Sequence, residues 1–163
     1  MPSSAKRRSP WSIVPSPSSS RGNQLRRWGP VVVWGVTISV FSTGYFTGEN
    51  TGAIIVPILA TIFPQASHAD LLAMHHFIRK LGHFTEYLIL SVLLYRALRG
   101  GRRWSLQAAA TAIVVAGLYA VLDEFHQLFV PGRTAAASDC LIDVSGAAAG
   151  QGLLAVVGRV LRS

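Results

Sequence analysis

Four apolar segments, each close to the length of a membrane crossing, constrain this chain more than any other feature. They lie at about 29–46, 77–98, 104–122 and 135–161. A helix needs roughly 20 mostly apolar residues to cross a hydrocarbon core of about 30 Å. Half of all residues are apolar and 13% are charged, whereas soluble domains carry about 25% charged residues. The sequence therefore predicts an all-α, polytopic membrane helical bundle with about four transmembrane helices.

A fifth apolar stretch, residues 52–64, is short for a crossing. It has 13 residues, with Pro57 inside it and Pro64 at its end. It is typical of a surface or re-entrant segment between the first and second transmembrane helices. Ser67 as N-cap, with Asp70 in the first turn, then predicts the start of a helix. We expect that helix to lie on the membrane surface and to turn near Gly82 into the second crossing.

Residues 1–28 differ in composition from the remainder of the chain, residues 29–162. They are rich in Ser, Pro and Arg and show no apolar period, which predicts a disordered basic tail before a membrane domain. With four crossings, twelve of the fifteen basic residues lie on the side of the tail, and Arg79, Lys80 and Arg133 lie on the other. By the positive-inside rule, we expect both termini to be cytoplasmic.

The formal net charge of +8 raises the question of a nucleic-acid partner. Because the basic residues lie between long apolar segments, we expect membrane lipids, and not nucleic acid, as partners. Cysteine occurs only at Cys140, so the chain has neither an internal disulfide nor a cysteine-based metal cluster. It also lacks the glycine-rich motifs that bind nucleotides. No cofactor is evident from sequence motifs.

Ionisable side chains gather at the predicted extracytoplasmic ends of the second, third and fourth crossings. An ionisable group at the edge of hydrocarbon is costly unless it is paired or hydrated, and it marks a candidate functional site. Since the three clusters share one depth, we expect them to converge. They comprise Lys80, His83, Glu86 and Tyr87; then Asp123, Glu124 and Gln127; and then Arg133, Asp139 and Asp143 after a Pro-Gly turn.

Small residues in the last apolar segment suggest how this convergence is achieved. Gly146 and Gly150 have the spacing that lets two membrane helices approach closely. Asp139 and Asp143 lie on one face of the same predicted helix, one turn apart. Close packing through the glycines would bring these two carboxylates near the other clusters.

Three sequence blocks resemble the VanZ-like family across roughly residues 30–160. The blocks are Lys80-x-x-His83-Phe84-x-Glu86-Tyr87, Asp123-Glu124-x-x-Gln127-x-Phe129-x-Pro131-Gly132-Arg133, and Asp139-x-x-x-Asp143-x-x-Gly146-x-x-x-Gly150. The resemblance implies a small, multi-spanning protein of the bacterial cell membrane and a role in the cell envelope. The namesake of the family is linked to resistance to the glycopeptide antibiotic teicoplanin. Family members often have Asn where this chain has Asp143, which makes the site of this chain more acidic.

These observations lead to the hypothesis of a site for an anionic lipid-linked headgroup or cell-wall precursor at the outer leaflet. Arg suits bidentate contact with phosphate, and Lys acts as a point charge. The carboxylates would orient the cations or hold a divalent metal ion, whose identity stays open. Whether the protein is an enzyme also stays open. The candidate catalytic residues are His83, Glu86, Asp123 and Glu124, and the candidate ligand-binding residues are Lys80, Gln127, Arg133, Asp139 and Asp143.

Two other function classes fit parts of the pattern. In a structural or interaction protein, the polar clusters would only lock the helices together. A proton or ion pathway is less well supported, because a relay needs groups along the whole path. The acidic residues other than Glu49 and Asp70 all lie in the three clusters.

Overall fold

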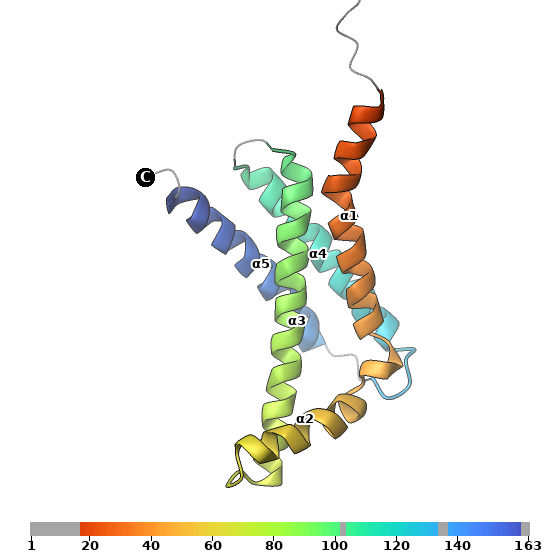
Figure 1. Cartoon of the computed structure of the whole chain (residues 1–163), viewed down its shortest axis with the longest axis vertical. Helices are drawn as coiled ribbons and strands as arrows, with labels where there is room; N and C mark the ends of the chain where they lie inside the picture. The colour runs from red at the N-terminus through yellow and green to blue at the C-terminus, as the bar shows by residue number, and fades with distance from the viewer. Residues whose placement is uncertain (1–16, 102–103, 134–136, 161–163) are drawn as a thin grey trace, which may run out of the picture.

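A computed structural model describes residues 17–101, 104–133 and 137–160 of the chain (Figure 1). Every regular element in these ranges is helical, which confirms the predicted all-α bundle. The elements are α1 (Pro17–Phe41), the short 3₁₀ helix η1 (Gly44–Phe46), α2 (Gly48–Ile62), α3 (His68–Arg99), α4 (Leu106–Gln127) and α5 (Ala137–Val160).

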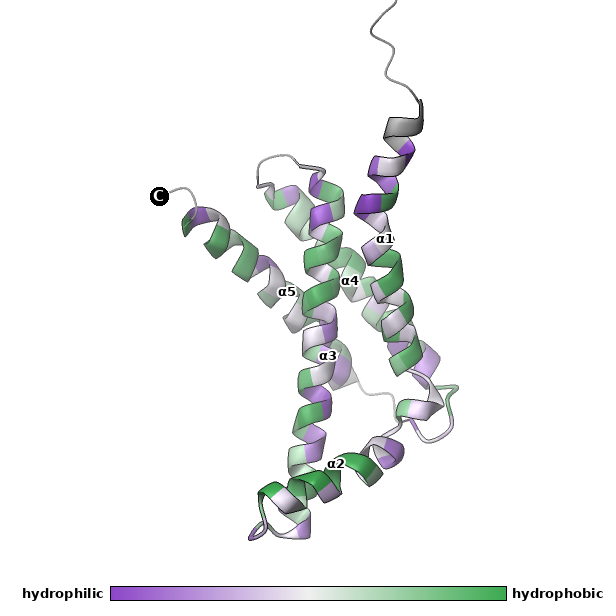
Figure 2. Cartoon of the chain, viewed as in Figure 1, coloured by the Kyte–Doolittle hydropathy of each residue, from purple (hydrophilic) through white to green (hydrophobic). Residues whose placement is uncertain are grey.

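The distribution of apolar side chains is that of a membrane protein. Large residues such as Val33, Ile58 and Leu118 are more than half exposed, while small ones such as Ala116 and Ala120 are fully buried in the core. Figure 2 shows long apolar stretches along α1, α2 and α3 and hydrophilic residues near the start of α1. Exposed apolar surface on this scale indicates contact with lipid.

The sequence predicted four crossings, but by length and composition the described helices support two, or three if the bent pair counts as one span. Helix α4 and residues Ser138–Val160 of α5 are long and apolar enough to cross a bilayer, and α1 with η1 and α2 form a bent pair that would make a third span. The bend in this pair is 61°. Helix α3 is long enough, but polar side chains such as Lys80, His83 and Glu86 lower its hydropathy. Those same polar residues belong to the predicted site.

Helix α3 begins as the sequence predicted but does not turn at Gly82. Ser67 and Asp70 form a reciprocal capping box, and the hydrogen bonds from Ser67 lower the pKa of the Asp70 carboxyl. The predicted change of direction is wrong, because one helix of 32 residues continues through Gly82. A single glycine weakens a helix without ending it. At about 1.5 Å per residue this helix is about 48 Å long, which exceeds the roughly 30 Å hydrocarbon core.

Helix α1 begins earlier than the sequence predicted. Residues 1–16 of the predicted tail lie outside the described residues, and α1 starts at Pro17, within the range that the sequence assigned to the tail. Proline is tolerated in the first turn of a helix. Farther along, Pro30 cannot donate to the carbonyl of Arg26. The Arg96 side chain of α3 donates to that carbonyl instead, at 3.5 Å.

Helices α3 and α5 cross at the two glycines that the sequence singled out. A Cβ atom on Gly146 would lie 2.1 Å from the carbonyl oxygen of Phe84, and one on Gly150 would lie 2.8 Å from that of Leu88. Only glycine permits this backbone approach, as the predicted small-residue spacing implied. At the residue after Gly150, the Gln151 amide donates to the backbone and hydroxyl oxygens of Ser91, at 2.9 and 2.7 Å.

One end of the bundle collects the elements that carry the predicted site. The end of α1, the start of α3, the end of α4 and the start of α5 lie there, and α2 runs from the end of α1 across to the start of α3 (Figure 1). Two hydrogen bonds attach helix α1 to the bundle. Trp34 Nε1 donates to the backbone carbonyl oxygen of Glu86, and the Tyr119 hydroxyl donates to the backbone carbonyl oxygen of Gly35. The polar end therefore forms one region of the fold.

Candidate functional site

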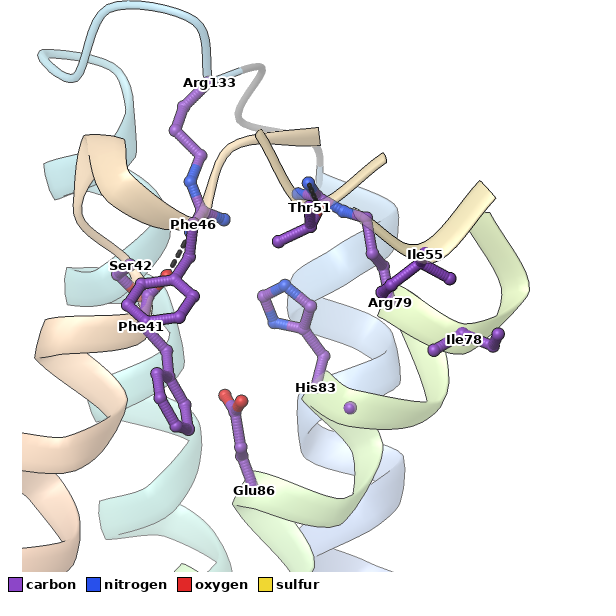
Figure 3. Close-up of a pocket in the computed structure, with 11 residues that line it drawn as sticks. Phe41, Ser42, Phe46, Thr51, Ile55, Ile78, Arg79, His83, Glu86 and Arg133 are labelled. Carbon is purple, nitrogen blue, oxygen red and sulfur yellow. Dashed lines mark hydrogen bonds between the residues drawn. The ribbon is translucent and has the colours of Figure 1, made fainter. Parts of the chain in front are cut away.

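A cavity of about 230 Å³ lies among α1, α2, α3 and the loop that follows α4. His83 and Glu86 project from α3 toward the space that Arg133 enters from the loop, and Arg79 lies on its α2 side (Figure 3). We call this space the cationic cavity. Its lining combines polar and apolar side chains, namely Phe41, Ser42, Phe46, Thr51, Ile55, Ile78, Arg79, Gly82, His83, Glu86 and Arg133.

A second cavity, of about 320 Å³, adjoins the cationic cavity and shares Arg79, His83 and Arg133 with it. We call it the polar cavity, because charged and polar residues predominate in its lining. Three further residues predicted from the sequence line it, namely Lys80, Gln127 and Asp139. The two cavities thus bring together residues from all three predicted clusters.

His83 of α3 and Asp143 of α5 form an ion pair at the site. Nδ1 of His83 lies 3.4 Å from Oδ1 of Asp143, which is an ion-pair distance. Asp143 is fully buried and His83 is partly exposed. The pair lies beside the glycine crossing, because His83 precedes Phe84 and Asp143 lies three residues before Gly146. The sequence analysis grouped His83 with Glu86, Asp123 and Glu124 as candidate catalytic residues, whereas this helix crossing makes Asp143, a candidate ligand-binding residue, its carboxylate partner.

Asp123 is held in a buried hydrogen-bond network. Its Oδ2 atom accepts from the Ser42 hydroxyl at 2.7 Å and from the Gln127 amide at 3.0 Å. All three residues are buried, and they join the end of α1 to the end of α4. Glu124, the next residue, is also buried, and its charge is among those that act on Arg133. Asp123 therefore helps to hold the end of α1 against α4.

Replacement of Asp123 by Ala is expected to destabilise the fold by about 1–3 kcal/mol, because it leaves the Ser42 hydroxyl and the Gln127 amide buried without their acceptor. Thermal unfolding of the purified variant in detergent measures the effect. The control is Thr111→Ala on the same helix, where an exposed hydroxyl that bonds its own helix is lost. An unchanged melting temperature for Asp123→Ala, combined with weaker ligand binding, would instead make Asp123 a direct ligand contact.

Arg133 is positioned by the C-terminus of α1. Its guanidinium donates to the carbonyl oxygen of Phe41 and, at 3.5 Å, to that of Thr43. The last carbonyls of a helix lack partners within the helix, so an arginine can cap them. Burial and then the positive charge of Arg79 lower the pKa of Arg133, while Asp123, Glu86 and Glu124 raise it. Two guanidinium groups that repel each other beside one cavity favour an anion between them.

The sequence reasoning missed several residues of the site, of which Arg79 is the most important. Its guanidinium reaches the Thr51 hydroxyl of α2 at 3.5 Å. The same hydroxyl is 3.1 Å from Nε2 of His75, and burial followed by the charge of Arg79 lowers the pKa of His75. The available signal was helical spacing, since His75, Arg79 and His83 recur every four residues. Conversely, Tyr87 is buried in the core and does not line either cavity.

Several side chains that line the two cavities can donate hydrogen bonds to an anion. Within residues 17–101, 104–133 and 137–160, no three His, Cys, Asp or Glu side chains are grouped so that they could hold a metal ion. Phosphate, in contrast, is bound by arginine, lysine and histidine donors, and these are the cations that line the two cavities.

Comparison with known proteins identifies one match. The family model described as VanZ/LLP1 matches residues 16–158, which is nearly the whole chain. The matched range includes the whole of α1 and all the residues that line the two cavities. Comparisons with curated proteins and with solved structures give no significant match.

Proposed function

The chain belongs to the VanZ/LLP1 family, and from that premise we propose that its cationic cavity binds the phosphate of an anionic lipid-linked headgroup, such as that of a cell-wall precursor. The observation that carries the proposal is the mixed lining of the cavity. Arg79, His83 and Arg133 supply donors for a phosphate, and the walls beside them include the apolar Phe46 and Ile55. Such a lining suits a ligand that has a charged head and an apolar continuation.

The proposal includes a topology in the bacterial plasma membrane. Helices α1, α3, α4 and α5 cross the bilayer, the cavities lie at the extracytoplasmic side, and both termini are cytoplasmic. The charge distribution supports this arrangement: Arg79, Lys80 and Arg133 lie at the cavity end, whereas Arg26, Arg96 and Arg159 belong to the opposite helix ends. A ligand would reach the cavities from the outer leaflet.

The topology predicts where a C-terminal reporter will be active. Alkaline phosphatase fused after residue 163, which needs an oxidising compartment, is expected to be inactive, and green fluorescent protein at the same position is expected to fluoresce. The same two reporters inserted in the loop after α2, between residues 63 and 66, should give the opposite result. Active phosphatase at the C-terminus would contradict the topology.

Catalysis on the bound phosphate is a second candidate, and the pair of His83 and Asp143 favours it. A carboxylate beside a histidine fixes the orientation of the imidazole and stabilises its charged form, which is how a general base or a nucleophile is prepared. The cavity also holds Glu86 beside His83. The positive charge that a phosphate needs comes from residues of the chain, so binding does not require a divalent metal. Protection of cell-wall precursors, and with it glycopeptide resistance, would be a consequence of either activity.

Replacement of Arg79 by Gln is expected to weaken binding of dodecyl phosphate by about 10- to 100-fold, since a hydrogen bond to a charged group contributes about 1.5–3 kcal/mol. Arg79 is preferred to Arg133 because Arg133 also caps α1. Binding is measured by titration of the full chain in phosphatidylcholine nanodiscs. The control is Arg159→Gln, which removes an exposed cation at the other end of the bundle.

The same experiment separates this proposal from the structural alternative. If the polar residues only lock the helices together, Arg79→Gln will lower the melting temperature and dodecyl phosphate will bind neither variant nor parent. If the cavity is a phosphate site, the parent will bind dodecyl phosphate more tightly than dodecanol, and Arg79→Gln will abolish that preference. Equal binding of the phosphate and the alcohol by the parent would refute a phosphate site.

A further inference from the structure

We propose that the hydrocarbon chain of the bound lipid lies in an apolar groove between α2 and the start of α3, which continues from the cationic cavity. This inference rests on the proposed function, because the groove is assigned to the tail of the same ligand whose phosphate occupies the cavity. The ligand class that follows is an amphiphile with a phosphate head and a long hydrocarbon chain.

The groove is apolar along its whole described lining. It has a volume of about 460 Å³ and lies where α2 approaches the first turns of α3 (Figure 1). Hydrocarbon and not a polar group is the occupant that such a lining favours. The residues that line it are Leu59, Phe63, Ala73, Met74, Phe77 and Ile78.

The groove and the cationic cavity share a wall. Ile78 lines both of them. On α3, Met74 in the groove, Ile78 at the junction and Gly82 in the cavity follow at intervals of four residues, so they share one helix face. On α2, Ile55 in the cavity and Leu59 in the groove are also four residues apart. Both helices therefore present one continuous face to the groove and the cavity.

Gly82 keeps the junction open. A Cβ atom at Gly82 would have no neighbour within 4 Å, although this residue lines the cavity beside Arg79 and His83. The space that a side chain would otherwise fill is available to a ligand that passes from the groove toward the cations. A phosphate between Arg79 and His83 would thus have its ester oxygen directed along α3 toward Ile78.

The other described cavities are less suitable for a hydrocarbon chain. The polar cavity adjoins the cationic cavity, but charged residues such as Lys80 and Asp139 line it. Two other cavities, at the opposite end of the bundle, share no lining residue with the cationic cavity. Among these cavities, the groove between α2 and α3 is the one that has an apolar lining and also adjoins the cationic cavity.

A photolabelling experiment tests this assignment. The probe is dodecyl phosphate with a diazirine in the middle of its chain, applied to the full protein in phosphatidylcholine nanodiscs, and labelled peptides are identified by mass spectrometry. We expect labelling within residues 59–78 that excess dodecyl phosphate suppresses and that inorganic phosphate suppresses much less. Suppressible labelling confined to α4 or α5 would overturn the chain path while leaving the phosphate site intact. Labelling that neither competition nor Arg79→Gln reduces would overturn the proposed function itself.

A groove-filling variant provides a second, independent test. Ala73→Trp places a large side chain in the groove at an exposed position, and Leu118→Trp on α4 is the matched control at an exposed position away from it. Ala73→Trp is expected to reduce the affinity for dodecyl phosphate at least tenfold and to leave the affinity for ethyl phosphate unchanged. Unchanged affinity for dodecyl phosphate in Ala73→Trp, together with loss of binding in Arg79→Gln, would refute the groove but not the phosphate site.

Discussion

Replacement of Gly146 by Leu is expected to disrupt the crossing of α3 and α5 and to destabilise the fold by about 3 kcal/mol or more, at the upper end of what overpacking costs. The Cβ atom alone would lie 2.1 Å from the carbonyl oxygen of Phe84 and 2.9 Å from its carbonyl carbon. Backbone atoms of a packed helix cannot yield as a flexible side chain does, so the two helices must separate. Thermal unfolding in detergent measures the loss.

The matched control for this variant lies on the same helix. Gly152→Leu introduces the same side chain at a glycine with no neighbour within 4 Å of a Cβ atom. It is expected to leave the melting temperature unchanged or to raise it, because glycine is about 1 kcal/mol less favourable than good helix formers inside a helix. If Gly146→Leu and Gly152→Leu melt at the same temperature, α3 and α5 do not cross through Gly146.

The second large effect is expected at Gly82, where the outcome is loss of ligand binding without loss of the fold. A phenylalanine at this position has room for its Cβ atom and directs its ring into the cationic cavity of about 230 Å³. Binding of dodecyl phosphate should weaken by at least about tenfold, or about 1.4 kcal/mol, because the ring occupies the space beside Arg79 and His83. Titration in nanodiscs measures binding, and thermal unfolding checks the fold.

The control for Gly82→Phe is Gly158→Phe, at another helical glycine without neighbours, close to the opposite end of the bundle. Both variants should fold, and only Gly82→Phe should lose binding. Together with Gly146→Leu, this pair separates glycines that allow helices to pack from a glycine that leaves room for a ligand. Normal binding by Gly82→Phe would mean that dodecyl phosphate occupies a different place.

The sequence predicted those parts of the molecule that depend on local pattern. Apolar segments of membrane length gave the four long helices, and the N-cap at Ser67 gave the start of α3. The spacing of Gly146 and Gly150 indicated a close helix crossing, which α3 supplies. Among the described residues, Arg79, Lys80 and Arg133 lie at the cavity end, whereas Arg26, Arg96 and Arg159 belong to the opposite helix ends, because successive long helices run in alternating directions (Figure 1).

The parts that the sequence did not predict depend on how elements meet in space. His83 is paired with Asp143 because the glycine crossing sets the register of α3 against α5, and no spacing within one helix contains that information. Arg79 was counted on the extracytoplasmic side but not among the candidate site residues, and only the fold of α2 shows Thr51 beside it. The continuous course of α3 through Gly82 could not be predicted either, since propensity alone permits both a bend and a continuous helix at a single glycine.

The separation of structural from ligand-facing polar groups also emerges only from the fold. Asp123 accepts from two buried donors, and its bond with Ser42 joins α4 to the end of α1. Gln151 donates to two buried acceptors on Ser91, which joins α5 to α3. His83, Arg79 and Arg133 instead border open space. The residue types are similar in the two groups. The sequence could therefore predict that they cluster, but it could not predict which residues hold helices together and which face a ligand.

The most direct test of the central claim is an experimental structure of the full chain in nanodiscs with dodecyl phosphate bound. The account predicts phosphate density in the cationic cavity, within hydrogen-bond distance of the guanidinium groups of Arg79 and Arg133, with the alkyl chain leaving past Ile78. Phosphate density at another place on the protein, or His83, Arg79 and Arg133 on surfaces that face apart, would contradict it.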